Sequence, residues 1–242
     1  MANNLYKYGI RFNGHHSSEF GLDVIDNKQI SFPSKNKILV GIPHSSMIYD
    51  FSTVTGVQPY KERDFTIPFN IIDRSLWTKD SMYEMWTRVL AWLMGPTKKS
   101  ELIDDVMSRY YYMAEVQDAP DFDELRFRGT LTVKFKCYPF RIATIRDFNG
   151  FWDPFSLEDG IDLDSDFIIN GNTEIVFINA GITKIVPLVS ASSEMNIIKN
   201  GITFTIPQGN SKSSDLFLDV GLNVMTVLGN GTLSFTFYSE VI

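Results

Sequence analysis

The chain has 242 residues, of which 44% are hydrophobic and 21% are charged, so it is long enough for one or two globular domains and too apolar to be disordered. Its net charge of −7, without any dense cluster of Lys and Arg, disfavours a nucleic-acid-binding site and binding to anionic membranes. Cys137 is the single cysteine, so an internal disulfide is excluded, which fits synthesis in a reducing cytoplasm.

Targeting signals are not evident at the start of the sequence. Residues 1–7 lack the basic start and apolar run of a signal peptide. The longest apolar run of the helical region, residues 89–94, is far below the roughly 20 residues that a membrane span needs. The sequence therefore predicts a soluble protein that has no membrane segment.

Residues 31–58 form a loop-rich stretch in which Pro33, Gly41, Pro43 and Gly56 punctuate short extended pieces. The stretch nevertheless contains many apolar residues. It is either an extended arm that packs on a neighbouring subunit or an ordinary surface loop, and composition alone leaves both open.

A helix is predicted at about residues 80–95. Its apolar residues recur at the spacing of one helix face and are Met82, Met85, Trp86, Val89, Leu90 and Leu93. Ser81 and Glu84 fit a capping box near the start, and Gly95-Pro96 gives a C-terminal stop. Such a stripe indicates packing on a sheet far more often than a cofactor site.

The remainder of the chain has the pattern of antiparallel strands. Alternating or β-branched and aromatic runs occur at residues 130–136, 174–178, 202–206 and 233–238. Asn-Gly, a strong hairpin signal, occurs at residues 13–14, 149–150, 170–171, 200–201 and 230–231. With Pro139 ending a strand, we expect a first domain over residues 1–139 and a second β-sandwich over residues 140–242.

Candidate chemical sites are weak. His15 and His16 are adjacent, so in an extended chain they point to opposite sides, and neither they nor His44 has a second metal ligand at a suitable spacing. Cys137 lies in an apolar run, so we interpret it as a small core residue rather than a nucleophile.

Two acidic segments are further candidate sites. Residues 162–166 begin like a calcium loop, but Phe167 and Thr173 stand where Gly and Glu are needed, so we interpret them as a strand with solvated carboxylates. Residues 118–124 form an acidic loop that could supply a glycosidase pair but is more typical of a solvated surface. No phosphate loop, nucleophile elbow or zinc motif occurs, so we predict no catalytic residues, no cofactor and no metal.

Several short motifs, in the right order and over nearly the whole chain, resemble the distal tail (Dit) proteins of long-tailed, non-contractile phages of Gram-positive hosts. They are Phe-Asn-Gly at residues 12–14, Ser-Glu-Phe-Gly-Leu at 18–22, Ile-Pro-His at 42–44, Tyr-Asp-Phe-Ser at 49–52, the strand 63–69, the helix 80–95, the strand 129–139, and the C-terminal runs 221–227, 229–231 and 235–238. Residues 44–47 depart from the Gly-Arg-Asp-Gly-like turn of many members, so the shape of that loop is expected to differ from theirs.

This resemblance implies a mainly β protein. Its first domain would be a β-sandwich with one packed α-helix and an extended arm, and its second a galectin-like β-sandwich that projects outward. Six copies would form a hub ring at the tail tip of the virion, after synthesis in the bacterial host cytoplasm. The ring would join the tail tube protein to the tail-tip protein (tail-associated lysin) and to receptor-binding or baseplate proteins.

A closed ring needs head-to-tail contacts, which an arm commonly strengthens. The candidate subunit-interface residues are Ile38, Leu39, Val40, Ile42, Met47 and Ile48. The alternatives are a carbohydrate-binding module for host wall polysaccharide, with Trp152 as its glycan candidate, a wall-degrading hydrolase that uses Asp121 or Asp123, and the tail tube protein itself.

Overall fold

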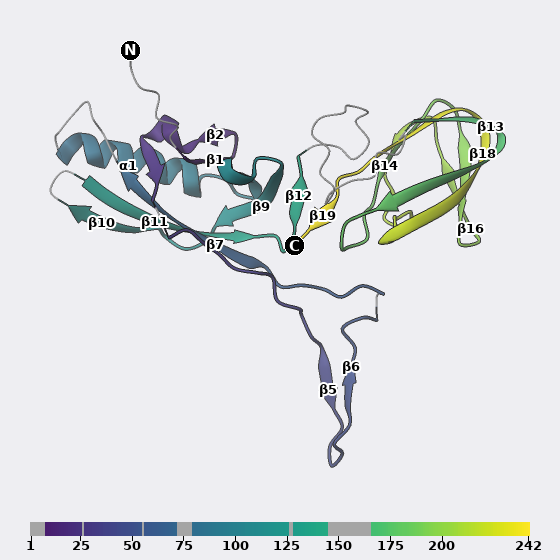
Figure 1. Ribbon diagram of the computed structural model, residues 1–242, viewed down its shortest axis with the longest axis horizontal. Coiled ribbons are helices and arrows are strands. Elements are labelled where there is room, and N and C mark those ends of the chain that lie inside the picture. The colour runs from purple at the N-terminus through teal and green to yellow at the C-terminus, as the bar shows by residue number, and fades with distance from the viewer. Residues whose placement is uncertain (1–7, 26, 55, 72–78, 126–127, 145–165) are drawn as a thin grey trace. The chain divides into compact units, whose positions relative to one another are not determined.

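A computed structural model describes residues 8–25, 27–54, 56–71, 79–125, 128–144 and 166–242 (Figure 1). The chain divides into two compact units, Met1–Arg141 with Ile242 and Ile142–Val241. Strands dominate both units, and the described residues contain one α-helix. The prediction of a mainly β protein with one packed helix is therefore confirmed.

The first unit is built on one large antiparallel sheet, in which the strands follow the order β2-β1-β8-β9-β11-β7-β3, while β10 pairs with β11 and β4 with β7. Its strands are β1 (Ile10–Phe12), β2 (His15–His16), β3 (Leu22–Val24), β4 (Gln29–Ile30), β7 (Arg63–Ile71), β8 (Ser100–Asp104), β9 (Tyr110–Val116), β10 (Asp121–Leu125) and β11 (Arg128–Cys137). Its helices are the 3₁₀ turns η1 (Ser17–Phe20) and η2 (Asp105–Met107) and the α-helix α1 (Lys79–Met94). Two further strands, β5 (Leu39–Gly41) and β6 (Ile48–Asp50), form a separate two-stranded sheet.

The core of the first unit follows from alternation along β7 and β11. Every second residue is apolar, and the pairing places Phe65 opposite Phe135 and Ile67 opposite Val133. Directly opposed residues of antiparallel strands share a face, so these four side chains form one buried layer. The opposite face of β7 and β11 carries residues such as Lys134 and is exposed to solvent.

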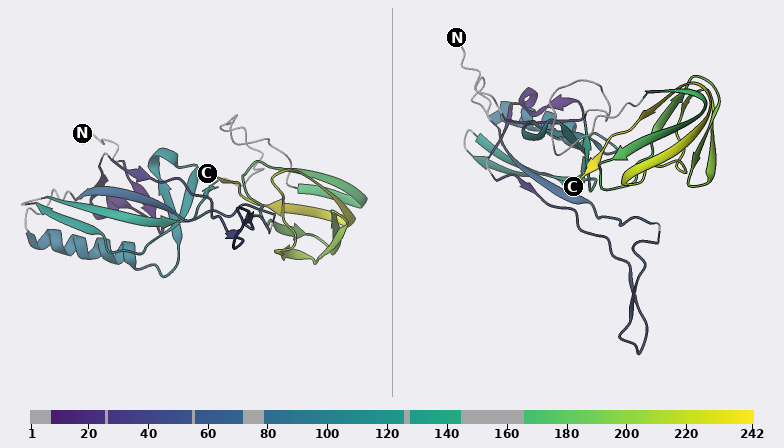
Figure 2. Two further views of the ribbon diagram at one scale, coloured as in Figure 1. Left: turned by 90° about the horizontal axis from the view of Figure 1, so that it is seen from below. Right: turned by 45° about the vertical axis from the view of Figure 1, so that its right-hand side comes forward.

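Helix α1 covers the core, and Figure 2 shows it lying along one face of the sheet. Val89 and Leu93 of the predicted stripe are fully buried. Trp92 is buried beside them and donates from its Nε1 to the Phe12 carbonyl at 2.9 Å. The predicted cap at Ser81 is wrong, because the helix already begins at Lys79.

The second unit is organised around two long strands, β13 (Asp166–Asn179) and β18 (Gly221–Thr236), which pair along their whole shared length. The sheet continues in the order β16-β15-β18-β14-β17. The other strands of this sheet are β14 (Leu188–Ala191), β15 (Met195–Lys199), β16 (Ile202–Ile206) and β17 (Gly209–Ser211). The strands β12 (Arg141–Ala143) and β19 (Glu240–Val241) are not part of it and pair with each other. Its core centres on Phe177 and Phe235, whose rings lie 4.5 Å apart.

The Asn-Gly signals have two different outcomes. Asn13-Gly14 and Asn200-Gly201 form hairpin turns with positive φ, as predicted. Asn170-Gly171 and Asn230-Gly231 instead lie inside β13 and β18, where Asn170 is opposite Asn230, so the prediction of turns there is wrong. Both dipeptides are held in the pairing of β13 with β18 instead. At Gly231 close packing also favours glycine, because a Cβ there would lie 2.3 Å from the Ser192 Oγ. Residues 149–150 lie outside the described residues.

Candidate assembly surface

The arm, residues 31–58, leaves the first unit after β4 and returns to it at β7 (Figure 1). Its outer part is the β5–β6 hairpin, in which Leu39 is opposite Asp50 and Val40 opposite Tyr49. Among the described strands, β5 and β6 pair only with each other. The hairpin is therefore an extension rather than part of the main sheet.

The base of the arm is fixed to the buried start of β7. The backbone N–H of Ser31 donates to the Asp64 carbonyl at 2.9 Å, and the N–H of Asp64 donates to the Ser31 Oγ at 2.7 Å. Arg63, which is only 3% exposed, donates from its Nε to the Ser31 carbonyl at 2.8 Å. Burial lowers the pKa of Arg63, and its guanidinium lies over the Tyr112 ring at 5.2 Å from the centroid.

Above the base, hydrogen bonds continue between the outgoing and returning chains. The Lys61 N–H donates to the Ser34 carbonyl and the Asn36 N–H to the Pro59 carbonyl, each at 2.8 Å. Further out, the Ile38 N–H donates to the Ser52 Oγ at 2.8 Å. Hydrogen bonds thus join the outgoing and returning chains both near the base and at the hairpin.

A surface ion pair braces the hairpin. The Lys37 Nζ lies 2.7 Å from the Asp50 Oδ2, and the Ser52 N–H donates to the Asp50 Oδ1 at 2.9 Å. Lys37, and then Ser52, lower the pKa of the Asp50 carboxyl to about 2. Asp50 therefore stays ionised throughout the physiological range.

The arm exposes large apolar side chains, which is unusual for residues held in regular structure. The predicted interface residues are 51% (Ile38), 56% (Leu39), 49% (Val40), 40% (Ile42), 58% (Met47) and 67% (Ile48) exposed. Tyr49 and Phe51 were not among the predicted interface residues, but they are 47% and 46% exposed, and their ring centroids lie 6.2 Å apart. The alternation of Met47, Tyr49 and Phe51 with other residues is the sequence signal that could have predicted them on one face of a strand.

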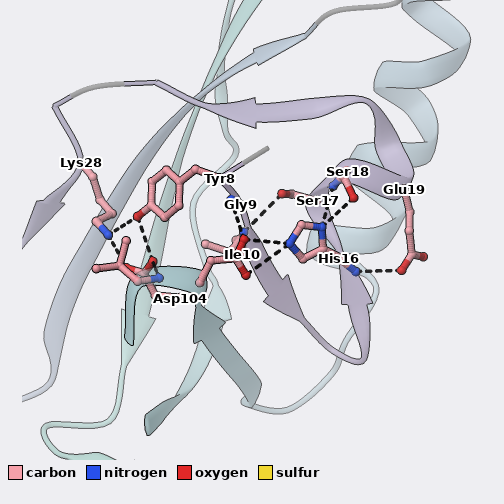
Figure 3. A network of polar contacts seen from close by, with 11 residues as sticks. Tyr8, Gly9, Ile10, His16, Ser17, Ser18, Glu19, Lys28 and Asp104 are labelled. Atoms are coloured by element: carbon pink, nitrogen blue, oxygen red, sulfur yellow. Dashed lines mark hydrogen bonds and ion pairs between the residues drawn. The ribbon is translucent and has the colours of Figure 1, made fainter. Parts of the chain in front are cut away.

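His16 lies in a polar network near the start of the described chain (Figure 3), whereas His44 lies in the turn of the arm. The His16 Nδ1 accepts a hydrogen bond from the Ser18 N–H at 3.2 Å, so its Nε2 carries the proton that faces the Asp105 carboxylate at 3.1 Å. His15 instead contacts Glu19 at 2.9 Å. The two rings therefore face different partners and do not converge on one point.

The same region contains a buried carboxylate, Asp104, which is 2% exposed. It accepts a hydrogen bond from the Tyr8 hydroxyl at 2.8 Å and pairs with the Lys28 ammonium, as Figure 3 shows. Burial, and then the contact with Asp104, raise the pKa of Tyr8. These contacts fasten three chain segments together, and we assign them a structural role.

The acidic segment at residues 118–124 is not a loop throughout, because Asp121–Leu125 is strand β10 and pairs with β11. The prediction of a loop there is wrong, since backbone pairing with β11 overrides the acidic composition. Trp152 and residues 162–165 lie outside the described residues. Within the described part of the chain, no group of three His, Cys, Asp or Glu side chains is placed to hold a metal ion.

Cys137 is fully buried at the end of β11. Burial raises the pKa of its thiol to about 12, which keeps the thiol protonated at neutral pH. None of the helices in the described residues is long and apolar enough to cross a membrane.

Comparison with solved structures shows that this fold is shared with a phage protein. The chain is similar to the crystal structure of the Dit protein of phage SPP1, which is described as a paradigm of the hub adsorption apparatus in phages that infect Gram-positive bacteria. The match covers 96% of this chain and 98% of that one, with a TM-score of 0.64 and 9% sequence identity. The predicted resemblance to distal tail proteins is thus confirmed at the level of the fold.

A second, weaker likeness is to the baseplate of phage p2 in its activated conformation with Sr. It covers 96% of this chain and 97% of that one, with a TM-score of 0.40 and 7% identity. No family model and no curated protein matches the sequence.

Proposed function

We propose that the chain is a structural distal tail protein, which forms the hub ring at the tail tip of a long-tailed, non-contractile phage. The observation that carries this proposal is the fold shared with the SPP1 Dit protein over almost the full length of both chains. The protein acts through its surfaces and not through an active site, so we propose no enzymatic activity.

The arm supplies the physical basis for a ring. Head-to-tail contacts between identical subunits close into a ring when one surface of each copy fits a different surface of the next. An extended hairpin with exposed Ile38, Val40 and Met47 is suited to reach a neighbouring copy. We propose that six copies assemble in this way, through residues 1–139.

The ring would occupy the tail tip of the virion. On one side it would contact the tail tube protein, and on the other the tail-tip protein (tail-associated lysin) and receptor-binding or baseplate proteins. Residues 140–242, the galectin-like domain, would project outward from the ring.

Deletion of the arm tests the proposal. In a variant that joins Lys35 to Val57 through a short Gly-Ser linker, the ends remain close because Lys35 bridges to Tyr60 across the base. Light scattering should give a hexamer for the full chain and a monomer for the deletion variant. Val106→Ser, on an exposed side chain of η2 outside the arm, is the control and should stay hexameric.

Two outcomes count against the proposal. If the deletion variant remained hexameric, the arm would not be required for assembly. A full chain that is monomeric and binds wall polysaccharide would favour the carbohydrate-binding module instead.

A further inference from the structure

Arg63 is a buried cation that has no carboxylate partner among the described residues. It is 3% exposed, and its guanidinium carbon lies 5.2 Å from the ring centroid of Tyr112 and 5.9 Å from that of Phe32. The adjacent acids, Glu62 and Asp64, pair with lysines instead. Burial of a charge is unfavourable unless a group of opposite charge compensates it. The first unit therefore holds a positive charge that an anion would stabilise.

Arg63 also has more hydrogen-bond donors than the described residues use. Its Nε donates to the Ser31 carbonyl at 2.8 Å, and its Nη1 reaches the Pro139 carbonyl at 3.4 Å, which is long for a hydrogen bond. The other N–H groups of Nη1 and Nη2 have no acceptor among the residues that the structure describes. They lie along one edge of the planar guanidinium, in the paired arrangement that matches two oxygens of an oxyanion.

A second arginine lies near this edge. Arg141 begins β12, which pairs with β9, and its guanidinium carbon lies 5.2 Å from the ring centroid of Tyr110. Tyr110 and Tyr112 both belong to β9, so their side chains share one face of the strand about 7 Å apart. Burial lowers the pKa of Arg63, and the charge of Arg141 lowers it further, which agrees with two neighbouring guanidinium groups.

Arg141 is incompletely satisfied as well. Its Nη1 donates to the Met107 Sδ at 3.5 Å, and sulfur is a weak acceptor. Its Nη2 donates to the Ile242 carbonyl. Its Nε is buried and has no hydrogen-bond partner among the described residues. Leaving a buried donor unpaired is unfavourable unless a ligand supplies an acceptor, so both arginines point to the same kind of ligand.

We propose that Arg63 and Arg141 together bind a phosphate group at the base of the arm. Two neighbouring guanidinium groups suit a tetrahedral anion, because its oxygens point in several directions and can pair with both arginines. The two oxygens of a carboxylate lie in one plane and match the edge of a single guanidinium. Since Arg63 also holds Ser31, a bound phosphate would steady the arm where it leaves the sheet.

Titration of the full chain with inorganic phosphate, at an ionic strength held constant with sodium chloride, tests the proposal. The NMR signals of the Arg63 and Arg141 Nε–H groups should shift with phosphate, and the melting temperature should rise because the ligand binds the folded chain. Arg141→Gln should weaken phosphate binding about tenfold or more, since it removes charged donors from the site. Arg88→Gln, which changes an exposed arginine of α1, is the matched control and should bind phosphate like the wild type.

Two further anions identify the ligand and its source. Acetate should bind at least about tenfold more weakly than phosphate, because it cannot pair with both arginines. Dimethyl phosphate stands for a phosphate within a polymer chain. Its binding would support the site with such a ligand, whereas binding of inorganic phosphate alone would support the site with a free or terminal phosphate.

Three results would overturn the proposal. If neither arginine signal moved with phosphate, the two guanidinium groups would have only a structural role. If Arg88→Gln weakened binding as much as Arg141→Gln, phosphate would be responding to general surface charge. If acetate bound as tightly as phosphate, the site would be one for a carboxylate. Melting curves of the variants without phosphate show whether each is folded before it is titrated.

Discussion

The Arg63 Nε donates to the carbonyl of Ser31 at 2.8 Å, and this contact joins the residue where the arm leaves the first unit to the residue where it returns. The Arg63 Nη1 reaches the Pro139 carbonyl at 3.4 Å, beyond the end of β11. The base of the arm is thus held by a side chain that is itself part of the buried core. Arg63 therefore fixes the base of the arm to the sheet of the first unit.

Replacement of this anchor should loosen the arm and lower global stability. Arg63→Met keeps most of the side-chain volume but removes the donors to the two carbonyl groups, so urea unfolding should show a loss of about 1–3 kcal/mol. Hydrogen exchange at the Asn36 and Lys61 amides should accelerate. Lys61→Met, which changes an exposed side chain, serves as control. If the two variants were equally stable, Arg63 would not be the anchor of the arm.

The Asp50 carboxyl should titrate at an unusually low pH. Its pKa is lowered from the ordinary 3.8 to about 2, so its interactions stabilise the hairpin fully above pH 3.8 and are lost as the pH falls toward 2. An NMR pH titration of the carboxyl carbon checks this. Lys37→Met should raise the midpoint toward 3.8, although the Ser52 N–H should keep it below that value. A wild-type midpoint near 3.8 contradicts the contact with Lys37.

A glycine inside β18 should be intolerant of substitution. Gly231 has a φ of +133°, and an added Cβ would lie 2.3 Å from the Ser192 Oγ, which accepts a hydrogen bond from the Thr232 N–H. Gly231→Ala should therefore cost about 2–4 kcal/mol of unfolding free energy in thermal or urea melts. Gly41→Ala, with open space around its Cβ, should be nearly neutral. A neutral Gly231→Ala would show that Ser192 can move aside.

Local pattern predicted the elements well where one signal dominated. The helix stripe identified Val89 and Leu93 as core residues because helical spacing is set by backbone geometry alone. Asn-Gly was ambiguous for a physical reason. Both Asn200-Gly201 and Asn170-Gly171 have a glycine at positive φ, but the first reverses the chain and the second lies within a long strand pair that tertiary packing holds.

The candidate surface was predictable only in part. Residues 31–58 could be identified as an extension. Composition could not show that Ile38 or Met47 would stay exposed, because apolar residues of a surface loop often point inward and are buried beneath the loop. The division of the arm into two faces depends on the pairing of Val40 with Tyr49, which the turn at residues 43–46 sets. Once that register is known, Tyr49 and Phe51 fall on the same face as Val40.

Negative-stain electron microscopy of the purified full chain tests the central claim most directly. A hub subunit whose arm docks on its neighbour should form six-fold rings with a central channel. Single particles of monomer size, at concentrations where light scattering detects no larger species, would contradict the account.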